Sequence, residues 1–274
     1  MSKNSSAAST AKRDAGRLRR SSWFRAGART GFAVSGLLHI LIGALAVSIA
    51  VGGGGGEADQ TGALSAIAST PAGALLLWVM VAGLFALAIW QVLEAVTVRE
   101  SDGSERVRAQ LKEAGKGAAY LVLAITALRY ATGGGGSGEK STEKATAGLL
   151  GSPLGAAVLL AVAAIVVAVG IGFVVSGFQK RFLTTITPPR GAAARGVTVL
   201  GQVGFIAKGI AVTVVGILLA AAVFTADPQR AGGLDGALKA LAALPFGVGI
   251  LIAIGLGFLA YGVFFFVRAW RARL

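Results

Sequence analysis

Six stretches of this chain are apolar over lengths that cross a membrane, and this feature restricts the fold more than any other. A helix needs about 20 apolar residues to cross the hydrocarbon core of a bilayer. Lipid offers no partner to backbone N–H and C=O groups, so each stretch is predicted to be helical. The third stretch is the weakest, because Lys116 and Arg129 interrupt it. The six stretches are 31–51, 72–98, 114–132, 153–178, 201–225 and 246–268.

The composition agrees with an all-α integral membrane protein and excludes several other classes. Hydrophobic residues make up 55% of the chain and charged residues 14%, whereas a soluble domain carries about 25% charged residues. Cysteine is absent, which excludes a disulfide scaffold and a thiolate metal site. The net charge of +14 comes mostly from residues that flank the apolar stretches, so we expect no nucleic acid partner.

The flanking charges predict the orientation of the chain. Of the basic residues that flank the six stretches, 19 lie on the side of the two termini and 4 lie on the other side. The positive-inside rule therefore places both termini in the cytoplasm, as in a multi-pass protein of the plasma membrane. Residues 1–29 are predicted to be a basic, largely disordered cytoplasmic tail. Anionic lipids of the cytoplasmic leaflet are one expected partner of this tail; a plain orientation signal is the other interpretation.

The same hairpin occurs three times in the sequence. The odd-numbered stretches share three positions, which hold Gly36, His39 and Gly43 in the first, Gly117, Tyr120 and Ala124 in the third, and Gly209, Val212 and Gly216 in the fifth. The even-numbered stretches share a Pro-x-Gly opening at Pro71, Pro153 and Pro245. We therefore predict three tandem two-helix hairpins: repeat 1 over 30–105, repeat 2 over 106–190 and repeat 3 over 191–274.

The three hairpins are predicted to share one orientation, because each starts and ends on the same side of the membrane. Repeats of this kind are related by an axis along the membrane normal. We expect a pseudo-threefold bundle, of which a closed ring of hairpins is the simplest form.

A short amphipathic segment precedes the second helix of repeats 1 and 3. Leu64 and Ile67 are three residues apart, as are Leu238 and Leu241, so each pair lies on one helix face. The expected N-caps are Thr61 and Asp235. An interfacial connector is the preferred interpretation of these segments, and a lid over a central site is the alternative.

Stripes of small residues are expected to hold the helices together. Lipid is as apolar as a helix surface, so association relies on close packing and hydrogen bonds. Glycines seven residues apart share a helix face and let two backbones approach. The helix-packing residues predicted in this way are Gly36, Gly43, Gly117, Gly209 and Gly216.

Few polar side chains lie within the apolar stretches, and an ionisable group there is a functional candidate by default. The candidates are His39, Tyr120 and Tyr261. A buried, hydrogen-bonded His39 is the preferred interpretation, and a pH-sensitive role is the alternative. Lys208 is interpreted as polarity near a cytoplasmic helix end, where it costs little.

Glu94 and Arg268 occupy equivalent positions, each 23 residues after the proline of its repeat. An ion pair between repeats 1 and 3 is one interpretation. Separate contacts with water or headgroups are the other, with equal weight.

No pattern in the sequence indicates catalysis or a cofactor. The glycine runs lack the lysine and the strand–helix context of a phosphate-binding loop. One histidine and no cysteine leave no pair of axial haem ligands, and no Ser-His-Asp set can be drawn. We therefore expect no enzyme, no catalytic residue, no metal site and no cofactor.

The repeated patterns resemble a known family. Three tandem hairpins, Gly-x4-Gly-x2-His/Tyr-x3-Gly in the odd stretches and Pro-x-Gly before the even ones are similar to an actinobacterial family of six-helix membrane proteins, catalogued as a domain of unknown function (DUF 1206). The resemblance covers about 25–274 and implies fold and membrane location, but no catalytic residue. Repeat 2 departs most from the pattern, because it lacks the first glycine and has Ile165 in place of a glycine.

Two functions are compatible with these observations. The leading interpretation is a non-enzymatic accessory or scaffold component of a membrane assembly, with another membrane protein or complex as its partner. The alternative is passage of a small solute, an ion or a lipid through the pseudo-threefold bundle. Passage would need a polar axis, for which His39, Tyr120 and Tyr261 are the available residues.

Overall fold

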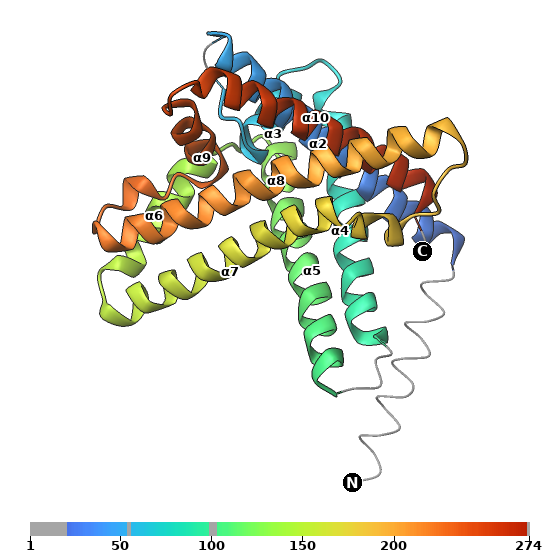
Figure 1. The fold of residues 1–274 in the computed structure, drawn as a ribbon, viewed down its shortest axis with the longest axis horizontal. Coiled ribbons are helices and arrows are strands. Elements are labelled where there is room, and N and C mark those ends of the chain that lie inside the picture. The colour runs from blue at the N-terminus through green and yellow to red at the C-terminus, as the bar shows by residue number, and fades with distance from the viewer. Residues whose placement is uncertain (1–20, 54–55, 99–102, 273–274) are drawn as a thin grey trace.

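The computed structural model describes residues 21–53, 56–98 and 103–272, and this part of the chain is built from helices. Its long helices are α2 (Ser22–Ala50), α4 (Gly73–Thr97), α5 (Gly103–Ala131), α7 (Pro153–Phe178), α8 (Ala192–Phe224) and α10 (Gly247–Arg271). Its short helices are α3 (Gln60–Ala68), α6 (Gly138–Leu150) and α9 (Gly233–Ala242), with two 3-10 turns, η1 (Arg181–Thr185) and η2 (Pro228–Arg230). Figure 1 shows the long helices as rods joined on one side by the short ones.

The predicted fold class is confirmed. Each predicted apolar stretch coincides with one long helix. Where the helix does not extend beyond the stretch, the ends of the two agree to within one residue. Helix α2 begins earlier than predicted, at Ser22, so the last part of the predicted tail is helical. Residues 1–20 of that tail lie outside the described part.

Five of the described helices are long and apolar enough to cross a membrane, namely α2, α4, α7, α8 and α10. Helix α5 is long but less apolar, because charged residues including Lys116 and Arg129 lie along it. Its role as a sixth span therefore stays a prediction. The chain is a multi-pass membrane protein in either case.

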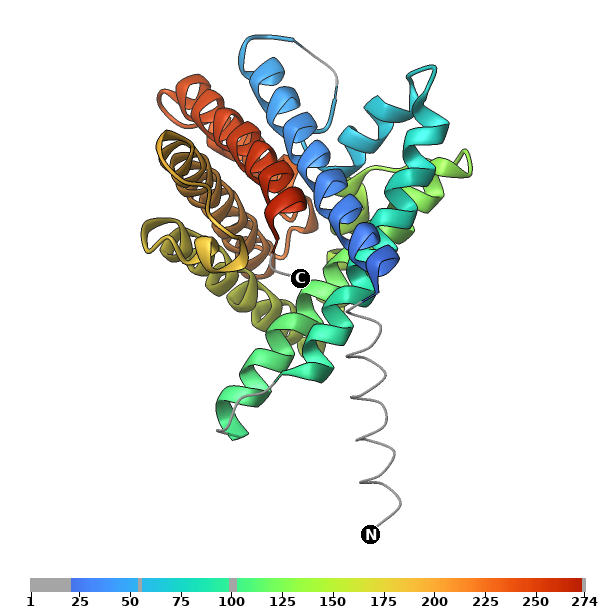
Figure 2. The same cartoon turned by 90° about the vertical axis from the view of Figure 1, so that its right-hand side faces the viewer.

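The long helices follow the cyclic order of a pseudo-threefold bundle. The most extensive contacts join neighbouring repeats, α10 with α2, α7 with α8, and α4 with α5. Within repeats, α2 packs on α4 and α8 packs on α10, but α5 and α7 share no comparable contact. Figure 2 shows the resulting series from α7 through α8, α10 and α2 to α4 and α5. The expected closed ring is therefore open between α5 and α7.

Repeat 2 opens because it lacks the small residues that bring the two helices of a hairpin together. In repeat 1, Gly31 of α2 lies against the carbonyl of Gly83 in α4. In repeat 3, Gly257 of α10 lies against the Cβ of Ala207 in α8. The position of Gly83 and Gly257 holds Ile165 in repeat 2. A branched side chain there prevents the close approach on which helix association in lipid depends.

The Pro-x-Gly motif has a steric reason in all three repeats. A Cβ at the glycine would collide with a carbonyl oxygen at the end of the preceding short helix. The three pairs are Gly73 with Ile67, Gly155 with Leu149, and Gly247 with Ala242. The glycine therefore lets the chain turn tightly from each short helix into the next long one.

The short helices α3, α6 and α9 pack together, and we call them the cap. The predicted apolar pairs of α3 and α9 are buried. The predicted N-caps are wrong. Asp59 caps α3 by accepting a hydrogen bond from the Gly62 N–H at 2.9 Å, and α9 has no side-chain cap. Thr61 instead accepts a hydrogen bond from the Gly138 N–H at 3.0 Å, and Asp235 accepts one from the Ala58 N–H at 2.7 Å, in each case from another repeat.

Candidate functional site

Polar side chains from all three repeats meet in the interior of the bundle. We call them the central polar cluster, which comprises Ser35 and His39 of α2, Tyr120 of α5, Lys208 of α8, and Tyr261 and Arg268 of α10. His39 and Lys208 lie near the middle of their helices, where the membrane is most hostile to charge.

His39 is held at both ring nitrogens. Its Nδ1 lies 2.6 Å from the backbone oxygen of Ser35, and this nitrogen carries the hydrogen because a carbonyl only accepts. The Nε2 atom then presents its lone pair to the Nζ of Lys208, 2.9 Å away. His39 is 7% exposed, so the preferred interpretation of a buried, hydrogen-bonded histidine agrees with this geometry.

Aromatic rings surround the His39–Lys208 pair. The His39 ring centroid lies 4.8 Å from that of Tyr261 and 5.8 Å from that of Phe265. The Lys208 Nζ lies 4.6 Å from the Tyr261 ring centroid and 5.2 Å from that of Phe173. Both distances are within the range of cation–π attraction, so the rings stabilise the ammonium where water is scarce.

Lys208 is the residue of the candidate site that the sequence interpretation misplaced. It lies in the middle of α8 and not at its end, because α8 starts at Ala192. The alignment of the three repeats contained a signal that could have placed Lys208 in the interior. Lys208 stands one residue before Gly209, as Ser35 stands before Gly36 and Lys116 before Gly117. A polar residue at this place in all three repeats marks a helix face that looks inward.

The polar contacts follow the pseudo-threefold symmetry. His39 of repeat 1 contacts Lys208 of repeat 3, and Tyr120 of repeat 2, which is equivalent to His39, interacts with the Ser35 side chain of repeat 1. The third contact of this kind would join Val212 to Lys116. Valine offers no polar atom, and Lys116 pairs with Glu113 at 2.7 Å instead. The series of polar contacts between repeats is therefore interrupted on the side of the bundle where the ring of helices is open.

Arg268 stacks on aromatic rings at the end of the cluster. Its guanidinium carbon lies 4.3 Å from the ring centroid of Phe32 and 5.4 Å from that of Phe265. Its Nε is buried without a hydrogen-bond partner. The ion pair expected between Glu94 and Arg268 stays a prediction.

A second polar network joins the three repeats through the cap. The Oδ1 of Asp235 accepts a hydrogen bond from the Ala58 N–H at 2.7 Å, which links repeats 3 and 1. Glu57 accepts from the Gly138 N–H at 3.0 Å, which links repeats 1 and 2. Lys239 contacts the Oε2 of Glu139 at 2.8 Å, which links repeats 3 and 2.

Burial and hydrogen bonding shift the pKa values of the cap. Burial alone would raise the pKa of Glu57, but hydrogen bonds from Ser137, Thr61 and Gly138 lower it overall. Burial raises the pKa of Asp59 against the opposing hydrogen bonds of Thr61 and Gly62. Hydrogen bonds to Asp235 and Glu139 raise the pKa of Lys239.

The predicted packing glycines lie at helix crossings. A Cβ at Gly36 would lie 2.8 Å from the carbonyl oxygen of Gly262, and one at Gly43 would lie 2.6 Å from that of Gly255, both in α10. A Cβ at Gly209 would lie 2.7 Å from the carbonyl oxygen of Gly170 in α7. Gly216 also faces α7, whereas Gly117 makes looser contacts of 3.4 Å with α4.

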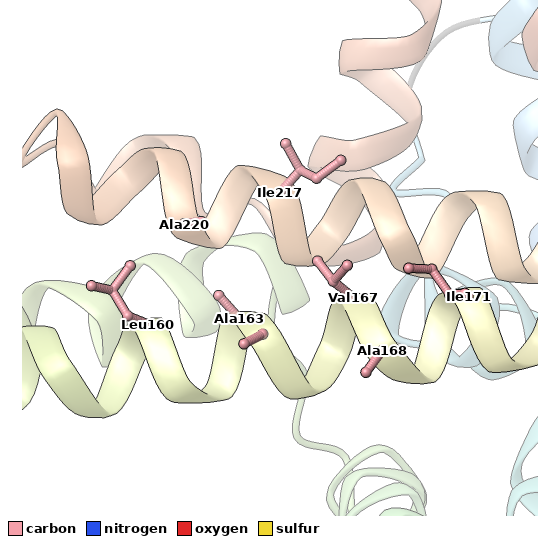
Figure 3. A pocket seen from close by; sticks show the side chains of 8 residues that line it. Leu160, Ala163, Val167, Ala168, Ile171, Ile217 and Ala220 are labelled. Atoms are coloured by element: carbon pink, nitrogen blue, oxygen red, sulfur yellow. The ribbon is translucent and has the colours of Figure 1, made fainter.

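An apolar groove of about 480 Å³ runs between α7 and α8. Alanines and branched side chains line it, among them Leu160, Val167, Ile171 and Ile217 (Figure 3). No residue of the central polar cluster lines this groove.

Helices long enough to cross a bilayer, arranged as three hairpins around a buried polar cluster, define a multi-pass integral membrane protein with tandem repeats. The family described as Domain of Unknown Function (DUF1206) matches the chain at residues 30–98, 111–180 and 203–272, one match in each predicted repeat. The chain therefore belongs to this family, in agreement with the resemblance seen in its sequence.

The comparisons also find a relative outside the actinobacteria. The chain is 33% identical over 249 residues to the uncharacterized protein YxxB of Bacillus subtilis strain 168, covering 88% of this chain and 89% of the relative. No solved structure matches the chain. Across the described residues, no group of three or more histidine, cysteine or acidic side chains is placed to hold a metal ion.

Proposed function

We propose that this protein is a non-enzymatic accessory component of a membrane assembly, located in the plasma membrane with both termini in the cytoplasm. The exposed apolar surface of α7 is the observation that supports this function. Of the most apolar 18-residue window in α7, 17% of the residues are buried, against 50% in α2, α4 and α10. A helix that buries so few of its residues against its own chain offers the rest of its apolar surface to another component of the membrane.

The groove between α7 and α8 fits one transmembrane helix of a partner protein. Its lining includes four alanines, Ala163, Ala164, Ala168 and Ala220. Small residues let a second helix backbone approach closely, which is the main source of helix association in lipid. The partner helix is therefore expected to carry small residues on the face that it turns to the groove.

Cross-linking in intact membranes tests this assignment. The chain has no cysteine, so a single cysteine at Ala168 provides a unique attachment point in the groove. Val162, which is exposed on another face of α7, provides the matched control position. We expect Ala168→Cys, but not Val162→Cys, to give one adduct of discrete mass that contains a different membrane protein.

A blocking variant makes the test specific. Ala164→Trp should fill the groove and abolish the adduct from Ala168→Cys while thermal stability in detergent is unchanged. An adduct that contains only this chain would indicate a homodimer and contradict the proposed partner. Equal labelling from Ala168→Cys and Val162→Cys, or no adduct from either, would also contradict the proposal.

Passage of a proton or a small ion is a second candidate function, and the His39–Lys208 contact at 2.9 Å favours it. Histidine changes charge between about pH 5 and about pH 8. Thermal unfolding of the wild type and of His39→Gln across that range tests the idea. A wild-type stability that changes with pH, together with a flat profile for His39→Gln, would favour passage over the accessory role.

A further inference from the structure

We propose that the central polar cluster binds an oxyanion of the phosphate class between Lys208 and Arg268. This site is separate from the α7–α8 groove and does not depend on the accessory role. The charges, the hydrogen-bond donors and the placement of the two cations each support it.

The cluster carries positive charge without a carboxylate to balance it. Among the described residues, ion pairs involve Arg108, Lys116, Arg230 and Lys239, and neither Lys208 nor Arg268 takes part in one. The two cations are close enough for their charges to repel. Charge within a membrane is costly unless an opposite charge accompanies it, so the cluster favours an anion.

The cluster also holds donors that the protein leaves without acceptors. The ammonium of Lys208 has three N–H groups; one is directed at His39, and the rings of Phe173 and Tyr261 lie 5.2 Å and 4.6 Å from its Nζ. The Nε of Arg268 is buried and has no hydrogen-bond partner. Buried donors in native proteins are paired with few exceptions, so an acceptor from outside the chain accounts for these groups.

The two cations lie over one pair of neighbouring rings. Lys208 lies over Tyr261 and Arg268 lies over Phe265, and the two ring centroids are 4.8 Å apart. Tyr261 and Arg268 are seven residues apart on α10, which is about two turns, so they share a helix face. Both cations therefore contact rings on one face of α10.

A phosphate group suits this arrangement better than a halide. It has several strong acceptor oxygens that can take hydrogen bonds from separate directions, and charge-assisted bonds to lysine and arginine are the strong ones. Tyr120 and Tyr261 place two further hydroxyl donors near Arg268. Free phosphate and a phospholipid headgroup present the same chemistry, and the experiment distinguishes them.

Thermal unfolding of the full-length protein in neutral detergent tests the site. One titration compares sodium phosphate with sodium chloride at equal ionic strength, and the other compares phosphatidylglycerol with phosphatidylcholine. We expect a dose-dependent rise in the melting temperature of the wild type with phosphate or with phosphatidylglycerol. A response to phosphate would identify a free anion, and a response to the lipid alone would identify a headgroup.

Three variants locate the effect. Lys208→Met and Arg268→Gln should each weaken the apparent affinity by about tenfold or more, since each removes a charge-assisted hydrogen bond. Arg271→Gln, which neutralises an exposed cation on the next turn of α10, should behave as the wild type. If Lys208→Met does not fold, the response of Arg268→Gln to the ligand tests the proposal. Arg268→Lys is then expected to restore part of the affinity that Arg268→Gln loses.

Two results would overturn the proposal. The first is a wild type whose melting temperature responds to neither phosphate nor phosphatidylglycerol. The second is an equal loss of the response in Arg271→Gln and Arg268→Gln, because a general surface charge would then explain it.

Discussion

His39 shows how one residue can join two repeats. Its Nδ1–H bonds within α2 and fixes the ring, and this leaves Nε2 as an acceptor aimed at Lys208 of repeat 3. The hydrogen bond to Ser35 thus selects the tautomer that the contact with Lys208 requires. The packing of Tyr261 and Phe265 on the ring keeps this geometry.

We expect His39→Gln to be tolerated and His39→Leu to destabilise the protein by about 1–2 kcal/mol, because leucine leaves the Lys208 ammonium without its acceptor. A glutamine amide can donate and accept, so it can replace both contacts. Thermal unfolding in detergent measures the effect. In the double variant His39→Leu/Lys208→Met the cost should be smaller than the sum of the single costs. Additive costs would show that the two side chains do not interact.

Glu57 gives the cap a pH dependence with a defined sign. Its folded pKa is lowered, so it adds stability above the ordinary glutamate pKa of about 4.3, and that stability is lost as the pH falls through the folded pKa. Asp59 contributes to the pH dependence of stability with the opposite sign, because its pKa is raised. We therefore expect Glu57→Gln to lose less stability on acidification than the wild type.

Thermal unfolding from about pH 3 to about pH 7 checks this, with ordinary carboxyl titration as the reference. Glu105→Gln is the control, because Glu105 forms an exposed ion pair with Arg108. Superimposable acid profiles for the wild type and Glu57→Gln would show that the cap carboxylate does not contribute.

At the scale of elements, close helix crossings distinguish glycines that pack from glycines that do not. The α7–α8 crossing brings Gly170 and Gly209 together, and a Cβ at either position would meet backbone atoms of the other helix. Gly172, on another face of α7, has open space around it. Gly170 and Gly172 are two residues apart and lie on different faces of α7, so they have different roles.

We expect Gly209→Ala to lower thermal stability, because neither helix backbone can move away without opening the crossing. Gly172→Ala is the matched control and should be neutral or stabilising by up to about 1 kcal/mol, as alanine favours helix. Melting temperatures in the same detergent compare the two. Equal effects of both substitutions would mean that the crossing tolerates a methyl group.

At the scale of the whole molecule, the count of membrane spans depends on α5. This helix packs along α4 but is less apolar than the five others. Basic flanks lie on one side of the membrane, with the excess of 19 against 4, only if α5 crosses the membrane.

Reporter fusions at Gly134, after α5, and at Pro228, after α8, should both report the external side of the membrane. A fusion at Gly54 should do the same, although this residue lies outside the described part. A cytoplasmic signal at Gly134 would remove α5 from the spans and contradict the six-span topology. Pro228 serves as the control, because α8 is apolar enough to cross by itself.

Much of the fold could be predicted from the sequence because the decisive signals are local. The length of each apolar stretch determined the long helices, and the recurrence of Pro-x-Gly and of the glycine stripes determined the three hairpins. Each of these features depends on residues within one or two helix turns. The basic flanks likewise predict an orientation without reference to packing.

The tertiary structure alone decided which side chains meet. Lys208 lies 169 residues from His39 in sequence, and Asp235 lies 177 residues from Ala58. Such contacts depend on how each helix is rotated about its axis and on which neighbour it faces, and hydrophobicity specifies neither inside lipid. The opening between α5 and α7 was likewise decided by the tertiary structure. Ile165 was visible as a departure from the repeat, but only the packed helices showed that α5 and α7 lie apart.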